Sequence, residues 1–177
     1  MSAIEPRRTA RLLLTRMRAQ DFDQLHAFHS DPQVMATLGG VRTRDETQRV
    51  LDELVAHWEQ HGFGYWMAHN RETRAFAGRG GLRRVVLDGR PEVEVGYGFM
   101  PECWGQGLAT ELARESIRVA FEELQLPELV CFTLPTNRAS QRVMEKAGFR
   151  YVGETVWANR PHVLYRLGRH VAEVTGS

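Results

Sequence analysis

Two amphipathic helices are predicted in the first third of the chain, each preceded by a residue that can cap its first turn. Asp21 with Gln24, and Thr43 with Glu46, have the spacing of capping boxes, in which the first side chain accepts a hydrogen bond from a backbone N–H three residues later. The first helix is expected to stop at Asp31-Pro32. The apolar face of the second helix repeats at helical spacing in Val50, Leu51, Leu54, Val55 and Trp58.

Beyond residue 62 the hydrophobic period changes to two, which is typical of strands. Strands are expected at residues 11–17, 65–69, 75–87 and 93–99, and Asp88-Gly89 predicts a hairpin between the last two. In the second half, helices at 107–124 and 137–147 alternate with strands at 129–134, 151–157 and 162–167. The expected fold is α+β, with a mixed, mostly antiparallel central sheet flanked by helices.

The composition indicates one ordinary globular domain, so residues 1–177 are interpreted as a single domain. Hydrophobic residues make up 42% of the chain and charged residues 25%, which argues against disorder and fibrous structure. The formal net charge of +1 comes with no long block of like charges, so nucleic acid is not expected as a partner. The apolar runs are shorter than a membrane span, and residues 1–11 lack the apolar core of a signal peptide.

The two cysteines indicate a reducing compartment. Cys103 and Cys131 have no metal-ligand spacing, and each lies in an otherwise regular segment. We interpret them as free thiols and expect the protein in the cytoplasm. Neither has a neighbouring histidine in the sequence that could activate it, so neither is expected to carry a covalent intermediate.

The most informative segment lies between the strand that ends at Phe99 and the helix that begins near Gly107. There Trp104-Gly105-Gln106-Gly107-Leu108-Ala109-Thr110 places small residues at a helix start. Unpaired N–H groups and the positive end of the helix dipole suit a phosphate, and glycines let it approach the backbone. The alternative is a glycine-rich turn that only connects strand to helix. A P-loop is excluded because Leu108-Ala109 follow the second glycine, and a dinucleotide fingerprint is excluded because Thr110 replaces its third glycine.

Three ordered motifs resemble the GNAT N-acetyltransferase superfamily. The run 96–111 (GYGFMPECWGQGLATE) is similar to the family's acetyl-CoA motif. The run 137–149, NRAS followed by EKAGF, is similar to the motif that lines the pantetheine arm, and 9–14 (TARLLL) is similar to the family's opening. The likeness covers residues 9–167 and is strongest to the branch that includes ribosomal-protein N-terminal acetyltransferases.

The resemblance implies an N-acetyltransferase that moves the acetyl group of acetyl-CoA directly to a primary amine in a ternary complex. The acceptor, a protein N-terminal α-amine or a small-molecule amine, is left open, as is a homodimer formed through the last strands. No metal is implied. Where Trp104 stands the family usually has Gln or Arg, so one side-chain contact to phosphate is missing. The residues implied for acetyl-CoA are Phe99, Met100, Trp104, Gly105, Gln106, Gly107, Leu108, Ala109, Thr110 and Asn137.

Acetylation requires a free-base amine, so a carboxylate that takes up the proton is expected. Alternation along the strand places Glu92 and Glu94 on one face with Gly96 and Gly98, which leave room for a ligand. Glu94 is the candidate base ahead of Glu92, and the alternative is a carboxylate that merely faces solvent. The oxyanion is expected to accept from the backbone N–H of Phe99 or Met100.

The departing thiolate needs a proton, which many relatives supply from a tyrosine at the position of Met144 here. Ser140 is the nearest hydroxyl by motif, and the alternative is that it bonds its own helix backbone. Because that tyrosine is missing, a non-catalytic, coenzyme A-binding regulatory or scaffold domain is kept as the second hypothesis.

Other residues have simpler interpretations. His57 and His61 have the i, i+4 spacing of zinc ligands but no evident third ligand, so no metal site is expected. The run Gly78-Arg79-Gly80-Gly81 is interpreted as a strand bulge, with phosphate contact as the alternative. Trp58, Tyr65 and Trp66 are expected in the core, with a place beside the acceptor as the alternative.

Overall fold

Eight strands form one sheet in the computed structural model, which describes residues 6–170. The strands are β1 (Arg7–Arg8), β2 (Leu12–Arg16), β3 (Tyr65–Asn70), β4 (Phe76–Leu87), β5 (Arg90–Phe99), β6 (Glu128–Thr133), β7 (Arg150–Trp157) and β8 (Arg160–Gly168). Their spatial order is β1-β2-β3-β4-β5-β6-β8-β7, and every neighbouring pair is antiparallel except β5 and β6. The expected α+β fold with a mostly antiparallel sheet is confirmed.

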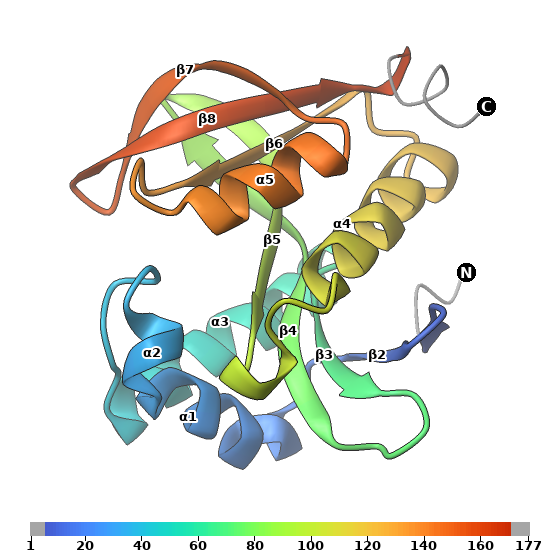
Figure 1. Ribbon diagram of the computed structural model, residues 1–177, viewed down its shortest axis with the longest axis vertical. Helices are drawn as coiled ribbons and strands as arrows, with labels where there is room; N and C mark the ends of the chain where they lie inside the picture. Colours follow the sequence, from blue (N-terminus) through green and yellow to red (C-terminus); the bar gives the residue numbers. More distant parts are fainter. Residues whose placement is uncertain (1–5, 171–177) are drawn as a thin grey trace.

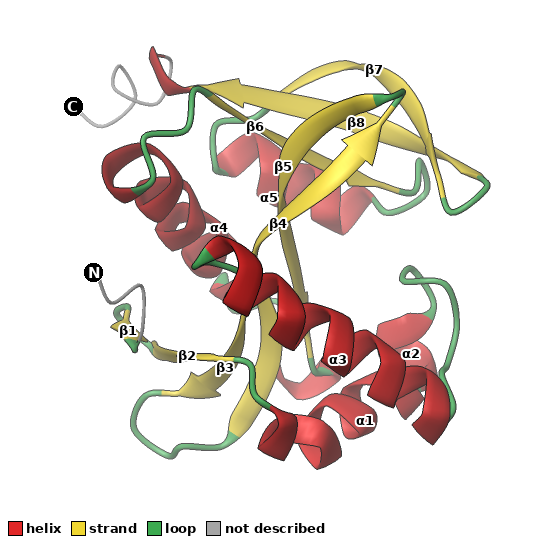
Figure 2. Ribbon diagram, turned by 180° about the vertical axis from the view of Figure 1, so that it is seen from behind, coloured by secondary structure: helices red, strands yellow, loops and turns green. Residues whose placement is uncertain are grey.

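Helices cover both faces of the sheet. They are α1 (Phe22–Ser30), α2 (Pro32–Met35), α3 (Arg44–His61), α4 (Leu108–Arg118) and α5 (Arg138–Lys146). In Figure 1, α4 and α5 lie in front of the sheet, whereas α3 lies behind it and comes to the front in Figure 2. Apolar side chains of α4, such as Leu112 and Ala113, are fully buried against the sheet. The packing of α4 matters for the site, because its first residue follows the glycine-rich segment.

The helix starts were predicted with mixed success. The capping box of Thr43 and Glu46 is confirmed, with both reciprocal bonds formed. The box at Asp21 is wrong, since the Asp21 carboxylate accepts from the backbone N–H of Arg18 instead. Asp31 does not simply end the first helix. Its carboxylate caps α2, a short helix that the sequence pattern missed and that begins at Pro32.

The predicted turns at Asp88-Gly89 and Gly148 are confirmed, and all three residues have a left-handed backbone. Asp88 and Gly89 have φ of 50° and 76° and form the tight β4–β5 hairpin. Gly148 follows α5 with φ of 102°, as expected for a residue just past a helix end. The bulge expected within Gly78–Gly81 is wrong, since these four residues pair with β3 in regular register. The register shifts between Ala68 and His69, which makes Ala77 the extra residue of β4.

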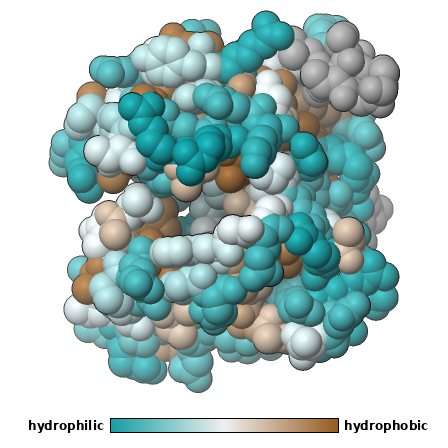
Figure 3. Space-filling model, in the orientation of Figure 1, coloured by the Kyte–Doolittle hydropathy of each residue, from teal (hydrophilic) through white to brown (hydrophobic). Residues whose placement is uncertain are grey.

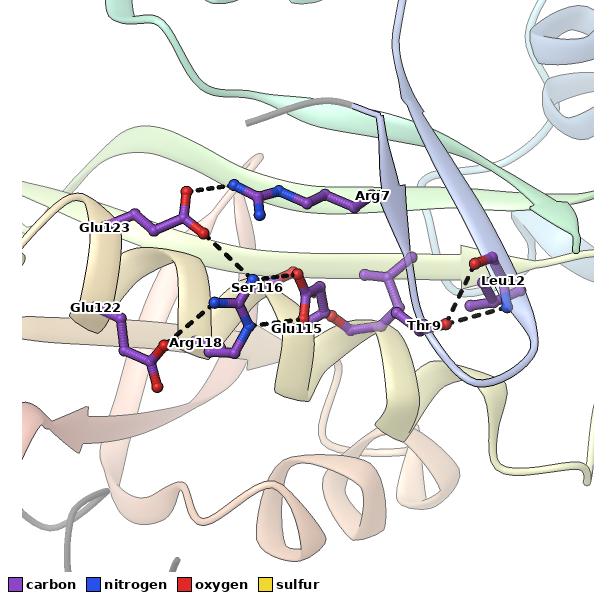
Figure 4. Close-up of polar contacts among 9 residues, drawn as sticks. Arg7, Thr9, Leu12, Glu115, Ser116, Arg118, Glu122 and Glu123 are labelled. Atoms are coloured by element: carbon purple, nitrogen blue, oxygen red, sulfur yellow. Dashed lines mark hydrogen bonds and ion pairs between the residues drawn. The ribbon is translucent and has the colours of Figure 1, made fainter. Parts of the chain in front are cut away.

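The chain start is tied to the far end of α4. Figure 4 shows Arg118 bonded to Glu115 and Glu122, with Glu123 lying between Arg118 and Arg7 of β1. The helix α4 stops at Arg118 and continues as one π-helical turn over Val119–Glu123, so the predicted helix to residue 124 is correct in extent but not in regularity. These ion pairs fix α4 against the sheet edge.

The single parallel pair opens the sheet. Between β5 and β6 one register pair forms, Glu94 with Val130, and beyond it the two strands diverge. The edge of β5 after Glu94 therefore has no strand beside it on the β6 side, although β4 still pairs with its other edge as far as Phe99. Unpaired strand edges bind extended chains by backbone hydrogen bonds.

Candidate functional site

A cavity of about 890 Å³ lies where β5 and β6 diverge. Its walls come from β5, β6, the start of α4, α5, the segment between α2 and α3, and the β7–β8 hairpin. Figure 3 shows the surface hollowed between the upper and lower halves of the molecule, with apolar side chains at the edge of the hollow. Nearly all of the sequence-predicted residues line this one cavity, namely Glu94, Phe99, Trp104, Gly105, Gly107, Leu108, Ala109, Thr110, Asn137 and Ser140.

The segment before α4 presents a row of free N–H groups. In the described part of the chain, none of the backbone N–H groups from Gly105 to Thr110 donates to a protein acceptor, and the first such bond comes from Glu111 to the Gly107 carbonyl. Gly105 and Gly107 have φ of 72° and 79°, which only glycine adopts readily. This is the arrangement that binds a phosphate at a helix start.

Arg11 holds this segment in place, a role that its position in the opening motif did not reveal. Its Nη1 donates to the Gln106 carbonyl oxygen at 2.6 Å, and its Nε donates to Glu111 Oε2 at 2.8 Å. Glu111 also accepts from Thr9 Oγ1 at 2.5 Å. Burial opposes ionisation of Glu111, but the bonds from Thr9 and Arg11 outweigh it and lower the pKa of this carboxyl. The Gln106 carbonyl is thereby bonded to Arg11, and Gln106 does not line the cavity.

Backbone groups alternate along the open edge of β5. The N–H of Met100 donates to the Ala77 carbonyl of β4 at 2.8 Å, so Met100 is not a free donor for an oxyanion, and this part of the expectation is wrong. In an antiparallel pair, N–H and C=O of one residue point to the same side, so those of Tyr97 and Phe99 point away from β4 into the gap. The Phe99 carbonyl accepts from Trp104 Nε1 at 2.7 Å. Of the two donors expected from the sequence, only the Phe99 N–H therefore remains.

Asn137 sits at the opposite wall with its amide already engaged. Its Oδ1 accepts from the Ser140 N–H at 3.2 Å, which starts α5, and its Nδ2 donates to Thr133 Oγ1 at 3.0 Å. One Nδ2 hydrogen and one Oδ1 lone pair remain for a ligand. Asn137 thus connects the end of β6 to the start of α5.

Glu94 is buried, with 6% of its surface exposed, and lies at the cavity floor. Its Oε2 accepts from Arg83 Nη2 at 2.7 Å, from Arg83 Nε at 3.0 Å and from the Tyr65 hydroxyl at 3.3 Å. All three bonds go to Oε2, so Oε1 keeps its lone pairs for another donor. Glu92, the other candidate, is bonded to Arg166 Nη2 at 2.8 Å and does not line the cavity.

A tyrosine that sequence reasoning did not single out accompanies Ser140. The Tyr97 hydroxyl lies 3.0 Å from both Ser140 Oγ and the Ser140 carbonyl oxygen. Burial raises the pKa of Tyr97 well above its ordinary value, so the phenol keeps its proton. Met144, where many relatives have tyrosine, is buried in the core. Tyr97 could have been identified only by knowing that β5 faces α5.

The remaining candidates have structural partners. His57 Nδ1 bonds the Phe63 carbonyl and its Nε2 accepts from the Arg84 N–H, so both ring nitrogens are engaged. In the described residues no group of three potential metal ligands occurs. Cys131 is buried and its thiol donates to the Val95 carbonyl at 3.0 Å, and burial raises its pKa.

His29 is a buried neutral histidine behind the cavity. Burial, together with the charges of Arg79 and Arg42, lowers its pKa from 6.5 to about 3. The unfolded chain takes up this proton near pH 6.5 and the folded protein only near pH 3, so acidification through this window favours unfolding.

We therefore expect the free energy of unfolding of wild type to fall more steeply between pH 6.5 and pH 3 than that of His29→Gln. The difference in slope approaches about 1.4 kcal/mol per pH unit, the value for one proton. Urea unfolding at a series of pH values measures it, and equal slopes for the two proteins would refute the assignment.

Comparison with known proteins agrees with this geometry. The model of the acetyltransferase (GNAT) domain matches residues 11–150. An uncharacterised Bacillus subtilis protein, YkkB, is 30% identical over 82% of this chain and 87% of its own length. The FsC-acetyl coenzyme A-N(2)-transacetylase of Aspergillus fumigatus is 34% identical over 81% of this chain and 64% of its own length. An acetyltransferase structure from Agrobacterium tumefaciens superposes with a TM-score of 0.82 at 29% identity, covering 94% of this chain and 96% of that one.

The open sheet and the helix α4 that starts beside it are shared with acetyltransferase structures, and the chain belongs to the GNAT acetyltransferase family. The predicted family and the predicted enzyme class, an acyltransferase that uses acetyl-CoA, are confirmed. The finer placement among ribosomal-protein N-terminal acetyltransferases stays a prediction. Among the described residues, no helix has the length and hydropathy that crossing a bilayer requires.

Proposed function

We propose that the protein transfers the acetyl group of acetyl-CoA directly to a primary amine inside the cavity between β5 and β6. One observation carries the proposal. The six backbone N–H groups from Gly105 to Thr110 donate no hydrogen bond within the described residues, and they lie beside the unpaired edge of β5. The first feature suits a pyrophosphate and the second suits an extended chain of amides. Coenzyme A contains both, and the cavity volume is of the size that small-molecule sites have.

The residues that hold acetyl-CoA follow from this placement. The amides of residues 105–110 bind the pyrophosphate, and the Tyr97 carbonyl and the Phe99 N–H bond the pantetheine arm. On the opposite wall, Asn137, Arg142 and Lys146 line the cavity from α5 and its cap. Acetyl-CoA supplies the activated acyl group. Of the two N–H groups that point into the gap, that of Tyr97 lies nearer to Glu94 along β5 and is the proposed donor to the acetyl oxygen, while that of Phe99 serves the pantetheine arm.

Glu94 is the proposed proton acceptor. Its Oε1 is free, while Arg83 and Tyr65 hold the carboxylate in one orientation through Oε2. The amine enters on the face of β5 that carries Glu94, whose carboxylate lines the cavity. The space beside Gly96 and Gly98 is taken by the side chains of Tyr65 and Phe28, so the room expected there from the sequence is not available to the amine. The amine loses its proton to the carboxylate, directly or through water.

Ser140 is the proposed proton donor to the departing thiolate, with the Tyr97 hydroxyl as its supporting partner. We expect Ser140→Ala to lower kcat about tenfold at pH 7, with little change in the KM for acetyl-CoA, since a thiolate leaves readily and needs only modest help. Ser140→Thr keeps the hydroxyl and should restore most of the rate. Steady-state kinetics on the three proteins decide the matter, and a wild-type kcat for Ser140→Ala would remove Ser140 from the mechanism.

The experiment that tests the proposed function is a screen of primary amines with acetyl-CoA, read out as release of the free thiol. Small amines, amino acids and short peptides with free N-termini cover both acceptor classes. Amine-dependent release that yields an N-acetylated product supports the proposal. The alternative, a coenzyme A-binding scaffold, predicts saturable binding of acetyl-CoA without release in the presence of any amine.

A further inference from the structure

Two arginines of β4, Arg79 and Arg83, line the cavity, and only Arg83 is paired with a carboxylate. Cross-strand partners share a face of the sheet, and β4 pairs with β5 as Arg83 with Glu94 and Arg79 with Gly98. Arg83 is neutralised by the carboxylate opposite it, at 2.7 Å. Opposite Arg79 stands a glycine, which has no side chain, and within residues 6–170 the Arg79 side chain forms no ion pair and no hydrogen bond.

The position of Arg79 is nonetheless well defined. Its guanidinium carbon lies 4.9 Å from the centre of the Phe28 ring and 5.1 Å from that of Tyr65. A side chain at position 98 would collide with Phe28, since a Cβ there would stand 2.6 Å from Cζ of the ring. Two aromatic rings therefore orient a cation whose side-chain N–H groups meet no acceptor among the residues that the structure describes. Burial lowers the pKa of Arg79, but a guanidinium does not lose its proton in a protein, so the charge persists.

Positively charged residues outnumber negatively charged ones around the cavity. The side chains of six basic residues line it, Arg42, Arg79, Arg83, Arg142, Lys146 and Arg160, against the single carboxylate of Glu94. Arg142 and Lys146 belong to the α5 wall proposed for the coenzyme. Arg42 lies at the end of the cavity where Arg79 contacts Phe28. Its backbone N–H donates at 2.9 Å to the carbonyl of His29, the residue that follows Phe28 in the chain. His29 carries no charge at neutral pH, so it neither adds to nor offsets Arg79 and Arg42.

We propose that the acceptor carries an anionic group, a carboxylate or a phosphate, on the same molecule as its amine, and that Arg79 binds this group. The inference rests on the proposed function and names the chemical class of its acceptor. A guanidinium fork bonds such oxyanions bidentately. The Arg79 guanidinium lies over the ring of Tyr65, whose hydroxyl donates to Glu94 Oε2, so an anionic group bound by Arg79 lies close to an amine at Glu94, as in an α-amino acid or a short ω-amino acid.

The same charges bear on the amine itself. An ammonium that enters beside Arg79 and Arg42 is repelled, so a polycationic amine is a poor acceptor. An amine whose own anion pairs with Arg79 gains this contact and is held near Glu94. The neighbouring guanidinium groups also favour the neutral form of the amine, which is the form that attacks.

The test compares matched acceptors. The amino acids, with β-alanine and γ-aminobutyrate, are each assayed beside the corresponding carboxamide and the decarboxylated amine, at saturating acetyl-CoA and at a pH above the amine pKa. An aminophosphonate series separates phosphate from carboxylate preference. Binding of the same compounds to the protein saturated with coenzyme A is measured by calorimetry. We expect at least one carboxylate or phosphonate acceptor to exceed its uncharged partner by about 10- to 100-fold in kcat/KM and in affinity.

Variants assign the preference to Arg79. Arg79→Met should remove the preference for the anionic member, mainly through KM, while leaving the thermal shift by acetyl-CoA unchanged. Arg79→Lys keeps the positive charge but not the bidentate guanidinium, so it should restore part of the preference for the anionic acceptor. Arg84→Met is the matched control, since Arg84 is an exposed arginine of the same strand that does not line the cavity, and it should behave as wild type.

The outcomes separate the two proposals. Turnover in which amides and decarboxylated amines equal or exceed their anionic partners overturns the anionic acceptor and leaves the acetyltransferase intact. Arg79-dependent binding of the anionic compounds with no thiol release supports the anion site and overturns acetyl transfer. An unchanged preference in Arg79→Met overturns the role of Arg79.

Discussion

At pH 7, Glu94→Gln is expected to lower kcat by about 10²- to 10⁴-fold, the usual scale for loss of a general base. The amide can still accept from Arg83, so the packing around position 94 is retained while proton uptake is lost. The defect should shrink as the pH rises through the pKa of the acceptor amine, because a neutral amine needs no base. Rates for wild type and variant between about pH 6.5 and 9.5, with one amine, measure both features.

Glu92→Gln is the matched control for this experiment. Glu92 lies two residues away on the same face of β5, is also paired with an arginine, and does not line the cavity. It should keep near wild-type rates at every pH. A loss in Glu94→Gln that does not change with pH would indicate that Glu94 only positions Arg83, and near wild-type rates would rule out any catalytic part for it.

Gly107→Val is expected to weaken acetyl-CoA binding by 100-fold or more and to abolish the rise in melting temperature that a native-state ligand produces. The backbone at this position has φ of 79°, and a β-branched residue is strongly disfavoured there. An ideal Cβ meets no atom closer than 3.5 Å, so the folded core is not disturbed. The cost falls on the direction of the N–H groups that follow.

Gly89→Val separates loss of the site from general strain. Gly89 has φ of 76°, no atom near its Cβ position, and a place at the β4–β5 turn outside the cavity. We expect it to lose a similar amount of stability and to keep the full acetyl-CoA shift. A full shift in Gly107→Val would mean that the phosphate binds somewhere else.

Features that depend on neighbouring residues were predictable from the sequence. The box of Thr43 and Glu46, the Asp88-Gly89 turn and the free amides before α4 all arise within a few residues. The same spacing at Asp21 gave a wrong prediction. A 3-10 turn over residues 19–21, which the sequence pattern did not predict, places the Asp21 carboxylate beside the Arg18 N–H. Local chemistry therefore predicted the free N–H groups of this segment, and the phosphate that they would bind stays a prediction.

Features that depend on strand pairing were not predictable. Alternation placed Glu94 with Gly96 and Gly98, but the partner of Glu94 depends on the β4–β5 register. The hydrogen bond from the Met100 N–H to the Ala77 carbonyl likewise depends on which edge of β5 pairs with β4. Tyr97 and Ser140 meet only because β5 and α5 face one another across the cavity.

Arg79 shows the same limitation most clearly. In the sequence it is one arginine among several, inside a glycine-rich run that was interpreted as a bulge. Its distinction is the absence of a carboxylate opposite it, which only the register with Gly98 reveals.

A crystal structure of the protein with coenzyme A tests the central claim most directly. We expect the pyrophosphate on the N–H groups of residues 105–110, the pantetheine arm along β5 in the gap to β6, and the sulfur beside Ser140, directed toward Glu94. Coenzyme A bound outside this gap, or with its sulfur directed away from Glu94, would contradict the claim.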